Sequence, residues 1–147
     1  MKKKLTIALV AHDNRKADMV EWAVHNADFL AVHHLVCTGT TGGLIAEAFN
    51  EKGIDADITR MHSGPMGGDA EIAAMVVRKE VNLAIFLIDD LNPQPHEADI
   101  QMLLRQCRVH NVPIACNRYS ADLMLTSSLW DDDDYIPTEP RYVFFNR

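Results

Sequence analysis

The chain has 147 residues, of which 48% are hydrophobic, and a formal net charge of -7. This length and apolar content fit one domain that spans 1–147 and buries a core of its own. Because the charge is acidic and no basic block occurs beyond Lys2–Lys4, we expect no nucleic-acid partner.

The amino-terminal segment imitates a signal peptide, since lysines precede the apolar run Leu5–Ala11. That run is at the lower limit of length for a signal peptide and continues directly into the polar segment His12–Lys16, so a buried first strand fits better. No stretch approaches the length of a membrane span, and we expect no membrane partner. The three cysteines form no CxxC pair and are predicted to be small buried residues in a reducing compartment, which favours the cytoplasm. They are Cys37, Cys107 and Cys116.

Short apolar runs alternate with helical patterns along the chain. Strands are predicted, in chain order, over Leu5–Ala11, His34–Cys37, Asp57–Met61, Leu83–Ile88 and Val112–Cys116. Helices are predicted over Lys16–Asn26, from a glycine-rich turn at Thr38–Gly43 through Phe49, over Asp69–Lys79, along the stripe Ile100, Leu103, Leu104 and Cys107, and over Ala121–Ser127. The alternation predicts an α/β fold with one open parallel five-stranded sheet and helices on both faces, of the flavodoxin-like kind.

Distinctive polar segments follow the first four predicted strands. Ligands of open parallel sheets bind at the carboxyl ends of the strands, so these segments should meet at one edge. They are His12–Lys16, Thr38–Gly42, Ser63–Asp69 and Pro93–Asp99.

The segment Ser63–Asp69 holds three glycines and a proline and precedes a helical pattern. A glycine-rich turn that opens a helix leaves backbone N–H groups free to hold an anion. Asp69 would then place a carboxylate that can act as a base beside a bound phosphate. The structural alternative is that Asp69 only caps the helix.

The segment Thr38–Gly43 is neither a Walker loop nor a GxGxxG dinucleotide motif. Alone it could be only a tight turn between a strand and a helix. Its hydroxyls and free amides nevertheless suit a phosphate monoester, for which Lys16 would supply the local cation that an acidic protein needs.

His96 lies between prolines and acidic residues on a long predicted loop, where a role in the core is unexpected. Together with Asp13 and Asp99 it predicts either acid–base chemistry or a metal site, although the spacing His96-x-x-Asp99 and the pair His12-Asp13 are weak metal signals. The remaining histidines are predicted to be surface or structural residues: His25, His33, His34, His62 and His110.

The four polar segments, in this order, resemble the motifs of the methylglyoxal synthase family. They read Val10-Ala-His-Asp13, Thr38-Gly-Thr-Thr-Gly42, Ser63-Gly-Pro-Met-Gly-Gly-Asp69 and Asn92-Pro-Gln-Pro-His-Glu-Ala-Asp99, and the resemblance runs from about Leu5 to Asp122. That family converts dihydroxyacetone phosphate to methylglyoxal and inorganic phosphate. The resemblance implies a five-stranded parallel α/β fold, a phosphorylated triose as substrate, a homohexamer, and neither metal nor cofactor.

The same resemblance implies roles for single residues. Asp69 would be the catalytic base, and His96 the neutral electrophile that polarises the carbonyl group. Asp13 and Asp99 would flank the reacting end of the substrate. The phosphate would be held by Lys16, Thr38, Thr40, Thr41, Ser63 and Gly64, with His12 in the same site. The implied reaction passes through an enediolate whose charge a fixed donor stabilises.

The sequence departs from the family pattern at Asp89-Asp-Leu91, where Asp-Pro-Leu is usual, and at Glu97-Ala98. The carboxyl terminus matches poorly, and Arg147 would be the counterpart of a family arginine that lines a neighbouring subunit's site. Three other functions stay open: a phosphosugar isomerase or another lyase that uses the same enediolate, a metal hydrolase, and a regulatory phosphate-binding domain, which would need neither Asp69 nor His96.

Overall fold

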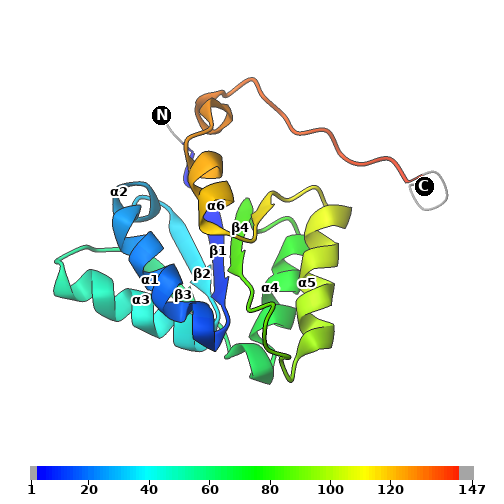
Figure 1. Ribbon diagram of the computed structural model, residues 1–147. Helices are drawn as coiled ribbons and strands as arrows, with labels where there is room; N and C mark the ends of the chain where they lie inside the picture. The colour runs from blue at the N-terminus through cyan, green and yellow to red at the C-terminus, as the bar shows by residue number, and fades with distance from the viewer. Residues whose placement is uncertain (1–2, 143–147) are drawn as a thin grey trace.

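The computed structural model describes residues 3–142 and shows one sheet of five parallel strands, in the order β3-β2-β1-β4-β5 (Figure 1). The strands are β1 (Thr6–Ala11), β2 (His34–Cys37), β3 (Asp57–Arg60), β4 (Leu83–Leu87) and β5 (Ile114–Ala115). The helices are α1 (Lys16–His25), α2 (Ala27–Leu30), α3 (Gly39–Glu51), α4 (Gly68–Val77), α5 (Glu97–Val109) and α6 (Arg118–Leu125). Short 3₁₀ turns occupy η1 (Asp13–Arg15), η2 (Gly64–Met66) and η3 (Ser128–Asp131). The predicted α/β fold with one open parallel five-stranded sheet is confirmed, but the strand order differs from the flavodoxin-like order 2-1-3-4-5.

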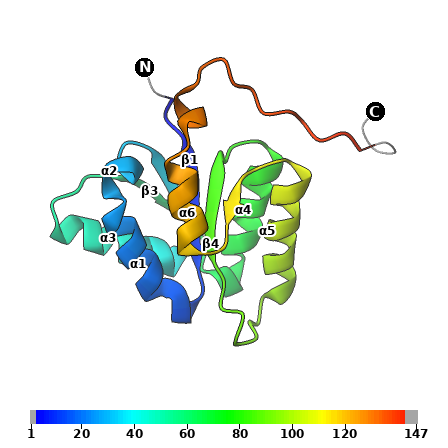
Figure 2. The same ribbon diagram turned by 45° about the horizontal axis from the view of Figure 1, so that its top comes forward.

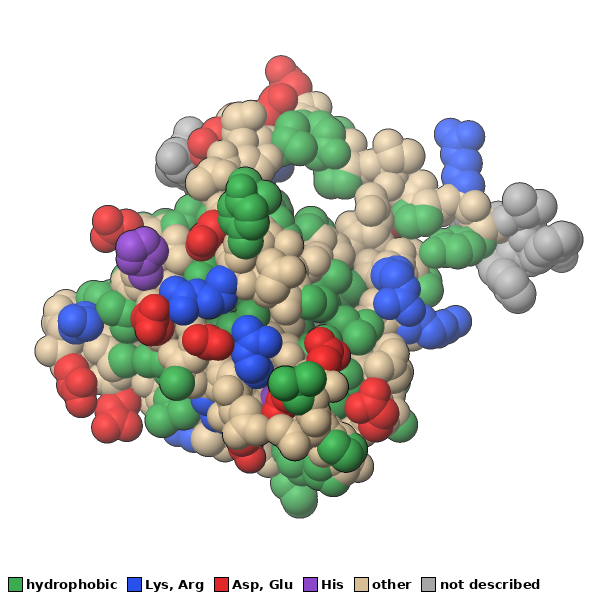
Figure 3. Space-filling model, in the orientation of Figure 1, with side chains coloured by type: hydrophobic (Ala, Val, Ile, Leu, Met, Phe, Trp, Pro, Cys, Tyr) green, Lys and Arg blue, Asp and Glu red, His purple; other side chains and the backbone are tan. Residues whose placement is uncertain are grey.

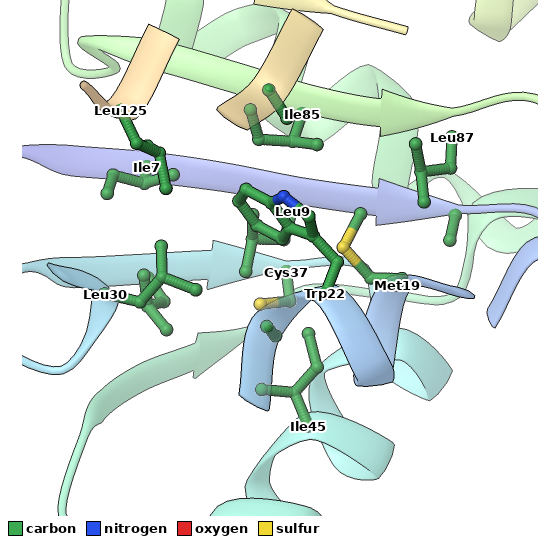
Figure 4. Packing of buried hydrophobic residues seen from close by; sticks show 14 of the residues in the cluster. Ile7, Leu9, Met19, Trp22, Leu30, Cys37, Ile45, Ile85, Leu87 and Leu125 are labelled. Carbon is green, nitrogen blue, oxygen red and sulfur yellow. The ribbon is translucent and has the colours of Figure 1, made fainter. Parts of the chain in front are cut away.

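Helices cover both faces of the sheet, with α1, α2, α3 and α6 on one side and α4 and α5 on the other (Figures 1 and 2). Successive side chains of a strand point to opposite faces. Ile7 and Leu9 of β1 therefore join the first layer, where Trp22 of α1 lies over Leu9 (Figure 4), while Ala8 and Val10 face α4 and α5. Because the central strands are buried on both faces, they read as continuous apolar runs. Each fully buried Ile or Leu contributes about 1.5–3 kcal/mol.

Helix α3 begins earlier than the sequence indicates. The run Thr38–Gly43 was predicted to be a turn before a helix, but it forms the first turn of α3 from Gly39 onward. The reason is close packing on the sheet. A Cβ added at Gly39 would lie 2.9 Å from the backbone oxygen of Met61, and one at Gly42 would lie 2.9 Å from Cγ of Arg60.

The last helix also starts ahead of its predicted first residue, Ala121. Helix α6 begins at Arg118 because the side chain of Asn117 accepts a hydrogen bond of 2.8 Å from the backbone N–H of Ser120. Asparagine is a strong amino-terminal cap, and this cap sets the start of the helix three residues before Ala121.

The prediction of three buried cysteines is wrong for Cys116. Cys37 and Cys107 are buried, whereas Cys116 is exposed, and all three are free thiols. Strand β5 lies at the edge of the sheet and ends at Ala115, so Cys116 follows where the chain leaves the core. Burial raises the pKa of the Cys37 thiol to about 12 and that of Cys107 to about 11.

Beyond η3 the chain crosses the surface in an extended conformation (Figures 1 and 2). It is held by hydrogen bonds from Asn111 Nδ2 to the carbonyl of Thr138, at 2.8 Å, and from Lys79 Nζ to Glu139, at 2.5 Å. Among the helices of residues 3–142, none has the length and apolar character needed to cross a membrane. The face shown in Figure 3 carries acidic and basic side chains intermixed. Arg147 lies outside the described residues.

Candidate active site

The segments that follow strands β1 to β4 meet around one cavity of about 130 Å³. This confirms that the polar segments share one edge of the sheet. Nine of the predicted site residues line the cavity: His12, Asp13, Lys16, Thr38, Thr40, Ser63, Gly64, Asp69 and His96.

Two predicted residues do not line the cavity. Thr41 is buried beneath it, where its hydroxyl lies 3.3 Å from that of Thr38 and 3.4 Å from the carbonyl of Ala11. Asp99 lies in the first turn of α5. It still acts on the site, because its negative charge raises the pKa of Asp69. Sequence reasoning gave no role to Gln94, a lining residue in the Pro-Gln-Pro segment, since a glutamine between prolines reads as an ordinary loop residue.

The turn before α4 buries Asp69. Gly67 adopts a left-handed conformation with φ of 108°, and the N–H of Gly68 donates to the carbonyl of Ser63 at 2.9 Å. A Cβ at Gly68 would lie 2.0 Å from the backbone oxygen of His62, so the start of α4 is pressed against the chain leaving β3. This geometry fixes where the helix begins and turns Asp69 inward.

The Asp69 carboxyl group is 0% exposed, and neither oxygen has a hydrogen-bond partner among the described residues. Burial raises its pKa because the charged form loses hydration, and the charge of Asp99 adds to the effect. His96 and Lys16 act in the opposite direction. A buried carboxylate with raised proton affinity in a polar cavity is suited to act as a general base.

The side chains of His96 and Asp69 lie close together, and both are next to the backbone of Gly64. Nε2 of His96 lies 3.6 Å from Oδ2 of Asp69, and Nδ1 of His96 is buried without a hydrogen-bond partner in the described part of the chain. A Cβ at Gly64 would lie 2.8 Å from Nε2 of His96 and 3.2 Å from Oδ1 of Asp69. Glycine is therefore required there for the two groups to face one cavity.

The His12 ring stands edge-on to that of His96, with centroids 5.7 Å apart. Its Nδ1 accepts a hydrogen bond of 2.8 Å from the backbone N–H of Asp89. Its pKa is lowered, first by burial and then by the neighbouring His96 and Lys16. Nε2 is buried and unpaired within residues 3–142.

One ligand atom from each of His12, Asp69 and His96 lies within 4.8 Å of the others, an arrangement known from metal centres with two histidines and one carboxylate. A metal-binding histidine, however, donates its second N–H to an acceptor. In His12 the second nitrogen accepts instead, so a neutral ring carries its proton on Nε2. Nε2 of His12 is therefore set up to donate a hydrogen bond and is not set up to bind a metal.

The part of the cavity around Lys16 suits an anion. Nζ of Lys16 donates to the carbonyl of Ala11 at 3.0 Å and to Asp13 at 2.7 Å, while the Asp13 side chain is 96% exposed at the rim. The hydrogen bond and charge of Lys16 lower the pKa of Asp13. Thr38 and Thr40 stand at the amino terminus of α3, whose first N–H groups and positive dipole end attract negative charge.

Known proteins resemble this chain over most of its length. A family model described as an MGS-like domain matches residues 18–116. The chain is 71% identical over 147 residues to a methylglyoxal synthase of Treponema socranskii, covering 100% of this chain and 93% of the relative. It is 45% identical over 136 residues to one of Coxiella burnetii (strain RSA 493 / Nine Mile phase I), covering 92% and 91%.

The crystal structure of a methylglyoxal synthase from Elizabethkingia anophelis NUHP1 superimposes with a TM-score of 0.83 at 37% identity, covering 97% of this chain and 90% of that one. The similarity extends over nearly the whole chain in sequence and in structure. The chain therefore belongs to the methylglyoxal synthase family.

Proposed function

We propose that the chain is a lyase that converts dihydroxyacetone phosphate to methylglyoxal and inorganic phosphate without a metal or other cofactor. One observation carries the proposal: a single cavity is lined by a buried base and donor, Asp69 and His96, and by the cation of Lys16 with the hydroxyls of α3. A phosphorylated triose brings a carbonyl with an adjacent acidic C–H and a phosphate within one small molecule.

The proposed chemistry begins at Asp69. Its carboxylate takes a proton from the hydroxymethyl carbon, and the C–H electron pair forms the double bond of an enediolate. His96 donates a hydrogen bond to the oxygen on which negative charge develops. The bond between carbon and the bridging phosphate oxygen then breaks, phosphate leaves with that electron pair, and the remaining enol rearranges to methylglyoxal.

The other residues have supporting roles in this proposal. Thr38, Thr40, Ser63, Gly64 and Lys16 hold the phosphate through hydroxyls, free amides and a cation. Thr41 holds the hydroxyl of Thr38, and Asp13 orients the ammonium group of Lys16. Asp99 keeps the proton affinity of Asp69 high through its negative charge.

Phosphorus NMR with dihydroxyacetone phosphate, combined with chemical trapping of methylglyoxal and no added metal, tests the proposal. We expect inorganic phosphate and methylglyoxal to appear in equal amounts. Asp69→Asn is the matched control, because it keeps the shape of the side chain and cannot accept the proton. Growth of glyceraldehyde 3-phosphate in place of inorganic phosphate would identify an isomerase instead.

We further propose that the chain acts as a cytoplasmic homohexamer. Support comes from the family and from apolar side chains beside the cavity, where Met66 is 73% and Leu91 is 92% exposed. Light scattering tests the assembly, and a fully active monomer at micromolar concentration would refute it.

A further inference from the structure

The turn that follows β4 is organised by the carboxylate of Asp89. Oδ2 accepts hydrogen bonds of 2.9 Å from the side-chain amides of Asn14 and Asn92, and Oδ1 accepts one of 3.1 Å from the backbone N–H of Leu91. The two amide hydrogen bonds are the main cause of a lowered pKa for Asp89, so the group is ionised at neutral pH. The carboxylate thus binds the turn to Asn14 of η1 and also closes the turn by binding Leu91 and Asn92.

This turn places the backbone N–H of Asp89 against His12 in the cavity wall. The N–H of Asp89 lies 2.8 Å from Nδ1 of His12, and the N–H of His12 in turn donates to the carbonyl of Leu87 at 3.2 Å. An imidazole nitrogen that accepts a hydrogen bond carries no proton, so the neutral ring holds its proton on Nε2. That nitrogen is buried and has no partner in the described chain, and His12 lines the cavity.

The contact also disfavours the charged ring. An imidazolium would need a proton on Nδ1, where it would oppose the Asp89 N–H. Among the surrounding charges, His96 and Lys16 lower the pKa of His12, whereas Asp89 and Glu97 raise it, and burial is the largest cause of the net lowering. Had the Asp89 carboxylate met the ring instead of the amide, the charged form would have been favoured.

We propose that the Asp89 turn is a positioning device that fixes His12 as a neutral Nε2–H donor aimed at a substrate oxygen. The proposal rests on the proposed function for its catalytic meaning. An enediolate carries oxygens on two adjacent carbons, and His96 and His12 would supply one fixed donor to each. Asp89 itself touches no substrate atom and acts through His12.

The tautomer can be observed directly, without turnover, by nitrogen NMR of histidine-labelled protein, with the His12 signals assigned from His12→Gln. We expect the parent to show an unprotonated Nδ1 and a protonated Nε2 at neutral pH. Asp89→Ala should give a mixture of tautomers, because the turn that holds the Asp89 N–H against Nδ1 loses its hydrogen bonds. It should also lower kcat by about 10- to 10³-fold, since loss of one preorganised donor costs about 10²–10³-fold.

Asp90→Ala is the matched control. Asp90 is the adjacent acid, is exposed, and makes no side-chain hydrogen bond within the described residues, so its replacement should leave tautomer and kcat unchanged. If Asp89→Ala does not fold, Asn92→Ala and Asn14→Ala each remove one hydrogen bond to the same carboxylate, and we expect both to shift the tautomer in the same direction.

A parent ring protonated on Nδ1 would overturn the proposal. So would a loss of kcat in Asp89→Ala with the tautomer of His12 unchanged, because that result indicates a purely structural role. If the parent shows the expected tautomer and produces no methylglyoxal, the tautomer assignment stands and the proposed function fails.

Discussion

Replacing Asp69 by asparagine should stabilise the protein while abolishing its activity. The carboxylate is buried and has no hydrogen-bond partner among the described residues, although Nε2 of His96 lies 3.6 Å from Oδ2. Burial raises its pKa, so the folded state disfavours its charge. An uncompensated buried charge costs several kcal/mol, and an unpaired buried amide about 1–3 kcal/mol. The difference is on the order of 1–3 kcal/mol, which corresponds to a rise in Tm of roughly 3–10 °C for a chain of this size.

The gain should depend on pH in a defined direction. Because the folded-state pKa of Asp69 lies above its unfolded value, the folded protein holds this proton at pH values where the unfolded chain has released it. Stability is therefore lost as the pH rises from the unfolded pKa through the folded one. Below the unfolded pKa both states are protonated and the cost disappears, so asparagine should stabilise at neutral pH and have little effect near the unfolded pKa.

Thermal unfolding of the parent and of Asp69→Asn at acidic and at neutral pH measures this effect. Asp133→Asn, which changes an exposed acid, is the control and should shift Tm little at either pH. Turnover of Asp69→Asn should fall by about 10²–10⁴-fold, as expected for a general base. A lower Tm at neutral pH, or a gain that is the same at both pH values, would refute the assignment of Asp69 as an uncompensated buried charge.

Three other substitutions test the remaining parts of the site. His96→Gln keeps a donor and should retain more activity than His96→Ala, and equal losses would remove the donor role. Lys16→Ala should raise KM and weaken inhibition by inorganic phosphate, whereas a loss in kcat alone would count against a phosphate contact. Gly64→Ala should reduce kcat, because a Cβ at Gly64 would lie 2.8 Å from Nε2 of His96, and an unchanged kcat would show that the two groups tolerate a side chain between them. Steady-state kinetics of each variant gives these comparisons.

Much of the site could be predicted because its residues belong to local sequence patterns. The apolar run of β4 and the polar segments after each strand indicate a parallel sheet, and the rule that ligands bind at strand ends brings Asp69 and His96 together. The arrangement of Thr41, which supports Thr38 from beneath, could not be predicted. Neither could the contact between the Asp89 backbone and His12, residues 77 positions apart in the sequence. No local pattern encodes a hydrogen bond between a main-chain amide and a distant ring.

The same limit applies to the start of α3. Glycines in sequence indicate a turn, since glycine weakens a helix. In the folded chain Gly39 and Gly42 belong to α3. Glycine stands at these helical positions because the helix lies too close to Met61 and Arg60 for a side chain. Tertiary packing overrides local preference there, and only the structure shows the surface that requires it.

The close contact of Gly68 with His62 makes one wall of the cavity tightly packed, whereas the other wall is formed by exposed residues that can move more easily. On one side the backbones of α3, α4 and the chain after β3 touch, with Gly39 also donating to the carbonyl of His62 at 3.0 Å. On the other side, residues 90–93 are exposed. Substrate exchange should therefore involve residues 93–95, which lie beyond the hydrogen bonds that Asp89 makes to Leu91 and Asn92, and the amide of Gln94 should exchange hydrogen faster than those at 62–68. Because His96 directly follows this segment, an outward movement that includes it would separate Nε2 from the carboxylate of Asp69, and the open site would lack its donor.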